Sequence, residues 1–336
     1  MSKKKVIVTG GAGFIGSHMV DLLISENYSV IVIDNLSGGH LKNINHHKNN
    51  KDLFLYEKDI NKISIDDKIF KEVEFIFHFA GIGDIVPSIE KPYEYMNTNI
   101  IGTVNILEGA RYNKINKFLY AASSSCYGIA KTPTDENHKI FPMYPYALSK
   151  YLGEQSIMHW NKVYNLPVIS IRIFNAYGQR VRTTGVYGAV FGVFFKQKIE
   201  NKPFTIVGDG EQSRDFIYVT DICKAFYQSA ISNYNCEIFN LGEGKPKKIN
   251  YLVQLLGKNE IKYITDRPGE PKITHANINK IKNMIDWKPE INFEKGVNLM
   301  LENINEWKDA PLWDVDSINK ATYEWFKYMN KNKKNL

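Results

Sequence analysis

"KVIVTGGAGFIGSH", residues 5–18, combines a short apolar strand, a turn rich in glycine and the start of an apolar helix. Gly10, Gly13 and Gly16 permit a tight turn and let the N-terminus of the helix approach a pyrophosphate, which its N–H groups and dipole favour. Glycine clusters also occur in plain turns, so the motif needs its context. Here a second apolar strand follows and ends at Asp34. This order predicts a dinucleotide site.

Asp34 indicates which dinucleotide would bind. A carboxylate at that strand end accepts hydrogen bonds from the adenosine ribose hydroxyls and repels a 2′-phosphate, so the sequence predicts NAD and not NADP. Asp59 and Ile60 are predicted at the adenine edge, with a helix N-cap as the alternative role for Asp59. Farther along, Ala80 and Gly81 end another strand and are small enough to let a cofactor approach.

Short β-rich runs alternate with helical patterns through the first half of the chain. The expected strands lie at residues 5–10, 29–34, 75–80, 117–123 and 168–174. Nearly continuous apolar strands alternating with helices predict an α/β fold, a doubly wound Rossmann-type parallel sheet covered on both faces. After about residue 175 the alternation is lost. We therefore expect an NAD-binding domain over 1–174 and a smaller C-terminal α/β substrate domain over 175–336, with 236–244 as a candidate return to the first sheet.

The composition points to a globular protein of a reducing, intracellular environment. The net charge of +7 comes with no basic stripe or recognition motif, so no nucleic-acid partner is expected. The longest apolar stretch, residues 186–195, is far shorter than the roughly 20 residues of a membrane-spanning helix. Glycines occupy the position where a signal peptide would carry its apolar region. We expect a cytoplasmic protein with no membrane partner.

Cysteines and histidines show no metal-ligand pattern. The three cysteines have neither metal-site spacing nor an even count for disulfides, which fits a reducing cytosol. His46 and His47 are adjacent in an Asn/Lys/His loop, and without a further ligand pattern we expect them in solvent. His78 is expected to be a packed core histidine. No metal site is predicted.

Tyr146 and Lys150 have the spacing of a catalytic pair. On a helix, residue i+4 lies on the same face, so the Lys150 ammonium would stand near the phenol. A phenol has a pKa of about 10, but an adjacent cation favours the phenolate and makes it a general base near neutrality. The pattern alone is weak in a chain with 20 tyrosines. Ser123 strengthens it, because it ends the preceding predicted strand and can relay a proton to Tyr146.

Nine motifs, taken together, resemble one family, the extended short-chain dehydrogenases/reductases of the NAD-dependent nucleotide-sugar epimerase/dehydratase type. Within it the chain is most similar to UDP-glucose and UDP-N-acetylglucosamine 4-epimerases. The motifs extend over nearly the whole chain: "TGGAGFIGSH", "DNL", "HFAG", "NTNIIGT", "SSSCYG", "YPYALSK", "RIFNAYG", "VGDGEQSRDFIYVTD" and "RPGE".

The resemblance implies the residues of the site. Ser123, Tyr146 and Lys150 would be the catalytic set. Tyr146 and Lys150 would also contact NAD, together with Gly10, Gly13, Phe14, Ile15, Gly16, Asp34, Asn35, Asp59, Ile60, Phe79, Ala80, Asn99 and Phe174. A nucleotide-diphosphate sugar would contact Asp84, Ser123, Ser124, Asn175, Arg214, Arg267 and Glu270. The two arginines match diphosphate-binding positions, and a guanidinium suits phosphate oxygens. A surface ion pair is the alternative for each arginine.

The resemblance also bears on the reaction. Dehydratases of the family typically carry an Asp-Glu pair directly after the catalytic hydroxyl residue, and this chain has Ser124 and Ser125 there. Two hydroxyls cannot supply the strong acid and base of water elimination, so we expect 4-epimerisation through a transient 4-keto sugar. A net nucleotide-sugar oxidoreductase, or another reaction of the family, is the alternative. The intact Ser123, Tyr146 and Lys150 argue against a non-enzymatic dinucleotide-binding protein.

Two further expectations concern the sugar and the assembly. Gly83 and Asp84 stand where some UDP-galactose epimerases place a lysine, and Thr274 occupies a wall position that is a tyrosine in epimerases refusing N-acetyl sugars. A small residue leaves room for an acetamido group. The family commonly forms homodimers through helices that correspond here to residues near 94–113 and 146–164. Core burial would explain the apolar positions of these helices equally well.

Overall fold

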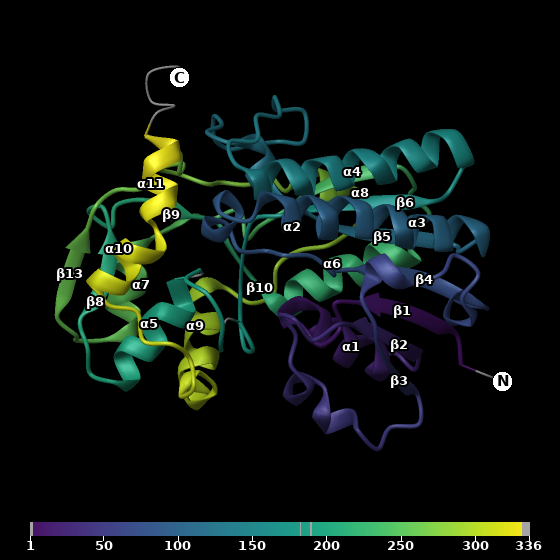
Figure 1. Cartoon of the computed structure of the whole chain (residues 1–336), viewed down its shortest axis with the longest axis horizontal. Helices are drawn as coiled ribbons and strands as arrows, with labels where there is room; N and C mark the ends of the chain where they lie inside the picture. The colour runs from purple at the N-terminus through teal and green to yellow at the C-terminus, as the bar shows by residue number, and fades with distance from the viewer. Residues whose placement is uncertain (1–2, 182, 189, 331–336) are drawn as a thin grey trace.

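The computed structural model describes residues 3–181, 183–188 and 190–330. The first half of the chain forms a sheet with helices on both faces, and much of the C-terminal segment forms a second, smaller body beside it (Figure 1). Within the described ranges, no helix combines the length and the apolar character needed to cross a bilayer.

The sheet has seven strands, all paired in parallel, in the order β11-β6-β5-β4-β1-β2-β3. The strands are β1 (Lys5–Thr9), β2 (Ser29–Asp34), β3 (Leu53–Glu57), β4 (Val73–His78), β5 (Lys117–Ser123), β6 (Val168–Ile173) and β11 (Glu237–Leu241). The predicted doubly wound Rossmann sheet is confirmed. Because β11 pairs with β6, the chain beyond residue 175 contributes to both bodies.

The strand order reverses between β1 and β4, and ligands of such sheets bind at the carboxyl ends of the strands beside this point. Gly10 follows β1 there, and Ala80 follows β4. A Cβ added at Gly10 would lie 2.7 Å from the Ala80 backbone nitrogen, so the two segments run in close contact. His78 ends β4 as a fully buried side chain bonded to two threonine hydroxyls, which agrees with a packed core role.

Two apolar clusters cover the two faces of the sheet. On one face, α1 (Phe14–Ser25) and α6 (Val219–Ile231) pack on β-branched and aromatic strand residues. On the other, α3 (Thr103–Tyr112) and α4 (Pro145–Tyr164) do the same. The short α2 (Pro92–Met96) leads through a π-helical turn into α3. The two-sided burial explains why the strands are nearly continuous apolar runs.

The second body has a core of stacked aromatic rings, among them Tyr177, Phe191, Phe216 and Phe293. Its short strand pairs are β7 with β10, β9 with β12 and β8 with β13. Their bounds are β7 (Asn175–Tyr177), β8 (Phe204–Val207), β9 (Ser213–Arg214), β10 (Phe216–Tyr218), β12 (Lys247–Lys248) and β13 (Ile261–Ile264). The remaining helices are α5 (Val190–Ile199), α7 (Ile249–Leu256), α8 (Asn279–Ile285), α9 (Phe293–Glu302), α10 (Val315–Ala321) and α11 (Tyr323–Met329).

Candidate active site

The glycine turn leaves the N-terminus of α1 open. The helix begins at Phe14 directly after Gly13, which has no side chain to cap the first N–H groups. A Cβ at Gly16 would lie 2.1 Å from the Gly10 carbonyl oxygen, so the turn closes this tightly only with glycine there. Uncapped N–H groups at the positive end of a helix dipole form an anion site. The turn therefore fits the pyrophosphate of a dinucleotide.

Asp34 lies buried against this turn. One carboxylate oxygen accepts the Ala12 N–H at 2.9 Å, and the other accepts the Leu36 N–H at 2.8 Å. Burial raises the pKa of the carboxyl, and these two backbone N–H groups oppose the rise. Each oxygen keeps a further lone pair for a hydroxyl. These acceptor oxygens fit the hydroxyls of a ribose diol, as the sequence predicts for NAD.

The predicted adenine-edge residues also lie together. Asp59 caps the short 3₁₀ turn Ile60–Lys62, and its carboxylate accepts the Asn61 N–H at 2.9 Å. The N-cap alternative left open for Asp59 is therefore present in the structure. Its second oxygen accepts a hydrogen bond of 3.4 Å from the Asn35 amide, which links it to another predicted cofactor residue. Ile60 is buried.

Asn99 ties the loop after β4 to the catalytic helix. Its side-chain oxygen accepts the Ile82 N–H at 2.8 Å, and its amide nitrogen donates to the Ser149 hydroxyl on α4 at 2.9 Å. The amide is thus engaged within the protein, and it positions the strand end where a cofactor would lie. Phe79 packs on Phe226 beneath the same strand end, with ring centroids 4.7 Å apart.

The predicted catalytic residues lie on β5 and on α4. Ser123 is the last residue of that strand, and Tyr146 lies in the first turn of α4, one turn before Lys150. The Ser123 hydroxyl donates to the Ser125 hydroxyl at 3.1 Å and accepts the Ser125 N–H at 3.2 Å. Ser123 and Tyr146 both line a large cavity that lies between the two bodies.

Lys150 is a buried amine on α4, one turn after Tyr146. Its Nζ lies 4.4 Å from the centroid of the Tyr120 ring, a distance typical of a cation–π contact. A Cβ at Gly81 would stand 3.9 Å from the same Nζ, so the ammonium reaches the end of β4. Burial lowers the pKa of Lys150 to about 7, and the negative charge of Glu154 opposes the shift. The i, i+4 spacing on α4 puts Lys150 on the same helix face as Tyr146.

Glu154 and Arg172 form a buried ion pair behind the catalytic helix. Two guanidinium nitrogens of Arg172 donate to the two carboxylate oxygens at 2.6 and 2.9 Å. Ser170 donates to the same carboxylate at 2.8 Å. The third nitrogen donates at 2.7 Å to the Tyr127 hydroxyl, which in turn donates to the Asn240 amide oxygen at 2.8 Å. Sequence reasoning missed this network, because its members come from four separate segments.

The cavity between the two bodies has a volume of about 350 Å³. Its lining includes every residue predicted to contact the substrate: Asp84, Ser123, Ser124, Asn175, Arg214, Arg267 and Glu270. Phe174 and Thr274 line it too. The arrangement brings residues from sequence positions far apart to one site, which combines hydroxyl groups with two guanidinium groups.

The two arginines share one carboxylate. Glu270 lies 3.4 Å from a guanidinium nitrogen of Arg214 and 3.2 Å from one of Arg267. Burial lowers the pKa of Arg214. Burial also acts to lower the pKa of Arg267, but the charges of Glu270, Tyr187 and Tyr144 together outweigh it and the pKa is raised. The Arg267 guanidinium carbon also lies 5.4 Å from the centroid of the Tyr187 ring, a contact that no sequence signal indicated. Two cations and one anion leave net positive charge for a diphosphate.

The fold and the Ser-Tyr-Lys site define an extended short-chain dehydrogenase/reductase. The family model for GDP-mannose 4,6 dehydratase matches residues 7–300. The chain is 40% identical over 301 residues to a putative UDP-glucose 4-epimerase of Methanocaldococcus jannaschii, covering 87% of this chain and 95% of the relative. The chain belongs to the extended short-chain dehydrogenases/reductases that act as nucleotide-sugar epimerases and dehydratases, and the predicted resemblance is confirmed.

Solved structures show the same likeness. A UDP-N-acetylglucosamine 4-epimerase from Methanobrevibacter ruminantium, in complex with UDP-N-acetylmuramic acid, superposes with a TM-score of 0.84 at 34% identity, covering 90% of this chain and all of that one. A UDP-glucuronic acid 4-epimerase from Bacillus cereus, in complex with UDP-glucuronic acid and NAD, gives a TM-score of 0.84 at 29% identity, covering 90% and 99%.

Replacing the buried ammonium gives the first prediction. The folded-state pKa of Lys150 lies below its ordinary value of 10.5. Burial of the charged amine therefore lowers the free energy of unfolding by its full amount below about pH 7, where the amine is protonated in both states. The effect disappears above pH 10.5, where the amine is neutral in both states. Lys150→Met should therefore raise the free energy of unfolding at pH 6, on the order of a few kcal/mol, and the gain should shrink toward pH 10. Urea denaturation at both pH values, without NAD, measures it.

Lys162→Met is the matched control, because Lys162 is exposed on the same helix. It should change stability little, and equally at the two pH values. A loss of stability at pH 6 in Lys150→Met, or a gain that does not depend on pH, would contradict the electrostatic account of Lys150.

Proposed function

We propose that this chain is an NAD-dependent 4-epimerase of a UDP-sugar. The observation that carries the proposal is one cavity lined both by Ser123 and Tyr146 and by the Arg214–Arg267–Glu270 cluster. A sugar nucleotide carries a matching pair of groups, a reacting carbinol for the hydroxyls and a diphosphate for the arginines. The 4-epimerases of UDP-sugars among the relatives and solved structures support the assignment.

The residues of the chain divide the reaction between them. The phenolate of Tyr146, favoured electrostatically by the Lys150 ammonium, takes the proton of the sugar 4-hydroxyl. Ser123 hydrogen-bonds that hydroxyl and relays its proton to Tyr146. Bound NAD would supply the hydride acceptor and return the hydride to C4. The arginine cluster holds the diphosphate while the 4-keto sugar turns its other face toward the site, and Tyr146 then gives the proton back.

Dehydration and net oxidation fit the site less well. Ser124 and Ser125 follow the catalytic serine, and both line the cavity with neutral hydroxyls. Such groups cannot act as the acid and base that remove water. An enzyme that returns its hydride needs no second substrate, whereas a net oxidoreductase would accumulate NADH in proportion to product. The absorbance of NADH therefore separates these two reactions.

The wall of the cavity favours an acetamido sugar. The Thr274 hydroxyl donates to the Asn175 amide oxygen at 2.9 Å and accepts the Asp215 N–H at 3.0 Å. These bonds hold a small side chain at the wall position. A tyrosine there would fill space that an N-acetyl group could occupy. We propose UDP-N-acetylglucosamine as the preferred substrate, with UDP-glucose and UDP-glucuronic acid as the competing candidates.

Proton NMR of the purified protein tests the proposed reaction. UDP-N-acetylglucosamine, incubated without added NAD, should yield its galacto epimer, because the cofactor is regenerated in each turnover. Tyr146→Phe should slow the reaction by roughly 100-fold or more, since it removes the general base while keeping the ring. NADH absorbance should stay constant during turnover.

UDP-glucose and UDP-glucuronic acid are the parallel arms of this experiment. If one of them is converted faster than UDP-N-acetylglucosamine, the 4-epimerase assignment stands and the preferred substrate changes. Product accompanied by equal NADH would instead make the protein a net oxidoreductase. If none of the three sugars changes even with NAD supplied, the UDP-sugar assignment fails.

Thr274→Tyr tests the wall assignment. The added ring should lower kcat/KM for UDP-N-acetylglucosamine at least about tenfold relative to UDP-glucose, because it excludes the acetamido group. Thr274→Val is the matched control: it loses the same two hydrogen bonds without adding bulk, and it should keep the preference. Unchanged turnover of the N-acetyl sugar by Thr274→Tyr would refute the wall role.

We further propose that the protein is cytoplasmic, because reduced cysteines such as the free Cys126 and Cys223 are stable there. We also propose that it forms a homodimer through α3 and α4. The two helices pack side by side, and they expose apolar side chains: Leu148 (39%), Leu152 (37%), Tyr112 (58%) and Tyr164 (48%). Leu148 and Leu152 lie one turn apart on α4, and exposed apolar residues that gather in this way are typical of interaction surfaces.

Leu152→Glu should convert the dimer to a monomer, because it buries a charge in the interface. Sedimentation equilibrium measures the mass. Leu312→Glu is the control, since Leu312 is exposed to a similar extent (40%) but belongs to neither helix. A wild-type protein that sediments as a monomer would rule the interface out.

A further inference from the structure

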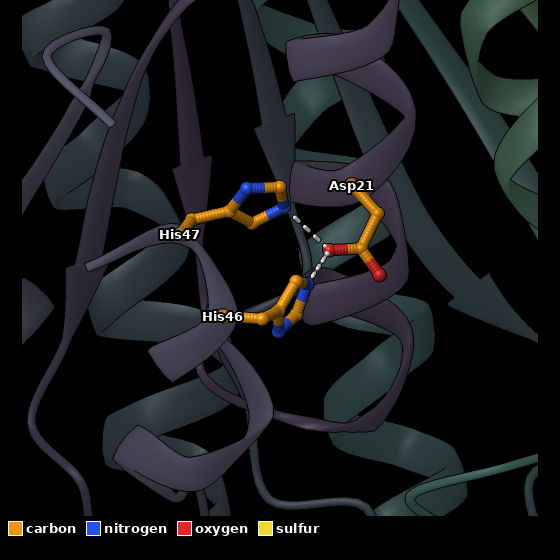
Figure 2. A group of neighbouring side chains, drawn as sticks. All are labelled: Asp21, His46 and His47. Atoms are coloured by element: carbon orange, nitrogen blue, oxygen red, sulfur yellow. Dashed lines mark hydrogen bonds and ion pairs between the residues drawn. The ribbon is translucent and has the colours of Figure 1, made fainter. Parts of the chain in front are cut away.

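Asp21, His46 and His47 gather on the surface of the dinucleotide-binding body. Asp21 belongs to α1, and the histidines belong to the 3₁₀ turn Asn45–His47. Figure 2 shows both imidazoles facing the same carboxylate oxygen, with Nε2 of His46 at 2.7 Å and Nε2 of His47 at 2.9 Å. The three potential ligand atoms all lie within 4.8 Å of one another. None of the three residues is among the described residues that line the cavity.

We propose that these three side chains bind a single Zn²⁺ ion. Two imidazole nitrogens and one carboxylate oxygen are ligands that Zn²⁺ takes in proteins, and a water would complete a tetrahedral set. Imidazole ligands favour zinc and its transition-metal neighbours over Mg²⁺ and Ca²⁺, which prefer oxygen. Metal–ligand distances near 2.0–2.2 Å place such donors about 3.3 Å apart, so the side chains need only small movements to admit the ion.

The carboxylate is already oriented for this role. Arg180 pairs with the other oxygen of Asp21 at 2.9 Å, which leaves Oδ1 directed toward the histidines. Arg180 is itself fixed, because it donates to the Ser17 hydroxyl at 3.1 Å and its backbone N–H donates to Glu306 at 2.8 Å. Partners that orient a ligating carboxylate are typical of protein metal sites. The positive charge of Arg180 opposes a cation, and it sets an upper limit on the affinity.

The site is open to an ion from solution. The side chain of His46 is 46% exposed, that of Asp21 30% and that of His47 17%. The sequence placed both histidines in solvent because their partner lies in a different element. A hydrogen-bonded cluster without metal is the competing interpretation, since a carboxylate can accept two imidazole N–H groups.

Zinc at this position would fasten the loop after β2 to α1. The loop already contacts the glycine turn, since the His40 N–H and the Asn43 amide both donate to the Ala12 carbonyl at 2.9 Å. Ala12 in turn donates to Asp34. The ion would therefore stabilise the segment that borders the predicted adenosine site, without touching the reacting atoms.

Calorimetric titration with ZnCl₂ tests the proposal on the full chain, first stripped with a chelator. We expect one Zn²⁺ per chain and a higher Tm with zinc, because an ion that binds the folded state stabilises it. His46→Gln and His47→Gln keep a hydrogen-bonding side chain but lose a ligand, and each should weaken binding at least about tenfold. His138→Gln removes the imidazole of a separate His–Asp pair, 3.1 Å from Asp135, and should change nothing.

A measurement on the wild-type chain keeps the test independent of how the variants fold. Of the eight histidines, two should shift their ring ¹⁵N resonances when zinc is added, and Co²⁺ should give the visible absorption of a four-coordinate nitrogen–oxygen site. Absence of zinc binding, or equal binding by the two glutamine variants and the wild type, would leave the hydrogen-bonded cluster as the correct interpretation.

Discussion

The ion pair between Glu154 and Arg172 is the interaction on which the geometry of the site depends. Both charges are buried between α4 and β6, and removing one partner of such a pair typically costs about 3–5 kcal/mol. Ser170 also donates a hydrogen bond to the Glu154 carboxylate, and Arg172 donates one to the Tyr127 hydroxyl. Because α4 also carries Tyr146 and Lys150, the pair fixes where these side chains meet the end of β5.

The same pair shapes the electrostatics of catalysis. Arg172 takes both oxygens of Glu154, so this carboxylate neutralises Lys150 only in part. In its protonated form Lys150 therefore keeps a positive field inside the protein, where charges act strongly. Burial lowers its pKa to about 7, which is the consequence of placing a cation where Tyr146 needs one. Active sites commonly sacrifice stability in this way.

The sequence predicted the parts of the molecule that local patterns specify. The apolar strands and the glycine turn determine the parallel sheet, and the motif order places Ser123 at a strand end and Tyr146 on the next helix. It could not predict contacts that only folding creates. Arg172 meets Glu154 and Tyr127 from other elements, and Asp21 meets two histidines of a distant loop. The sequence also left two roles open for Asp59, because the same side chain can cap a turn and border the predicted adenine site.

The family carries the name of a dehydratase, yet the residues around the sugar argue for a different outcome. In the proposed mechanism, removal of hydride from C4 needs only Ser123, Tyr146, Lys150 and a cofactor, and dehydration and epimerisation share this step. The fate of the 4-keto sugar then depends on the neighbouring groups. An acid and a base beside it would eliminate water, whereas the hydroxyls of Ser124 and Ser125 leave the sugar intact. A ketone that is neither dehydrated nor released recovers its hydride on one face or the other, and recovery on the opposite face is epimerisation.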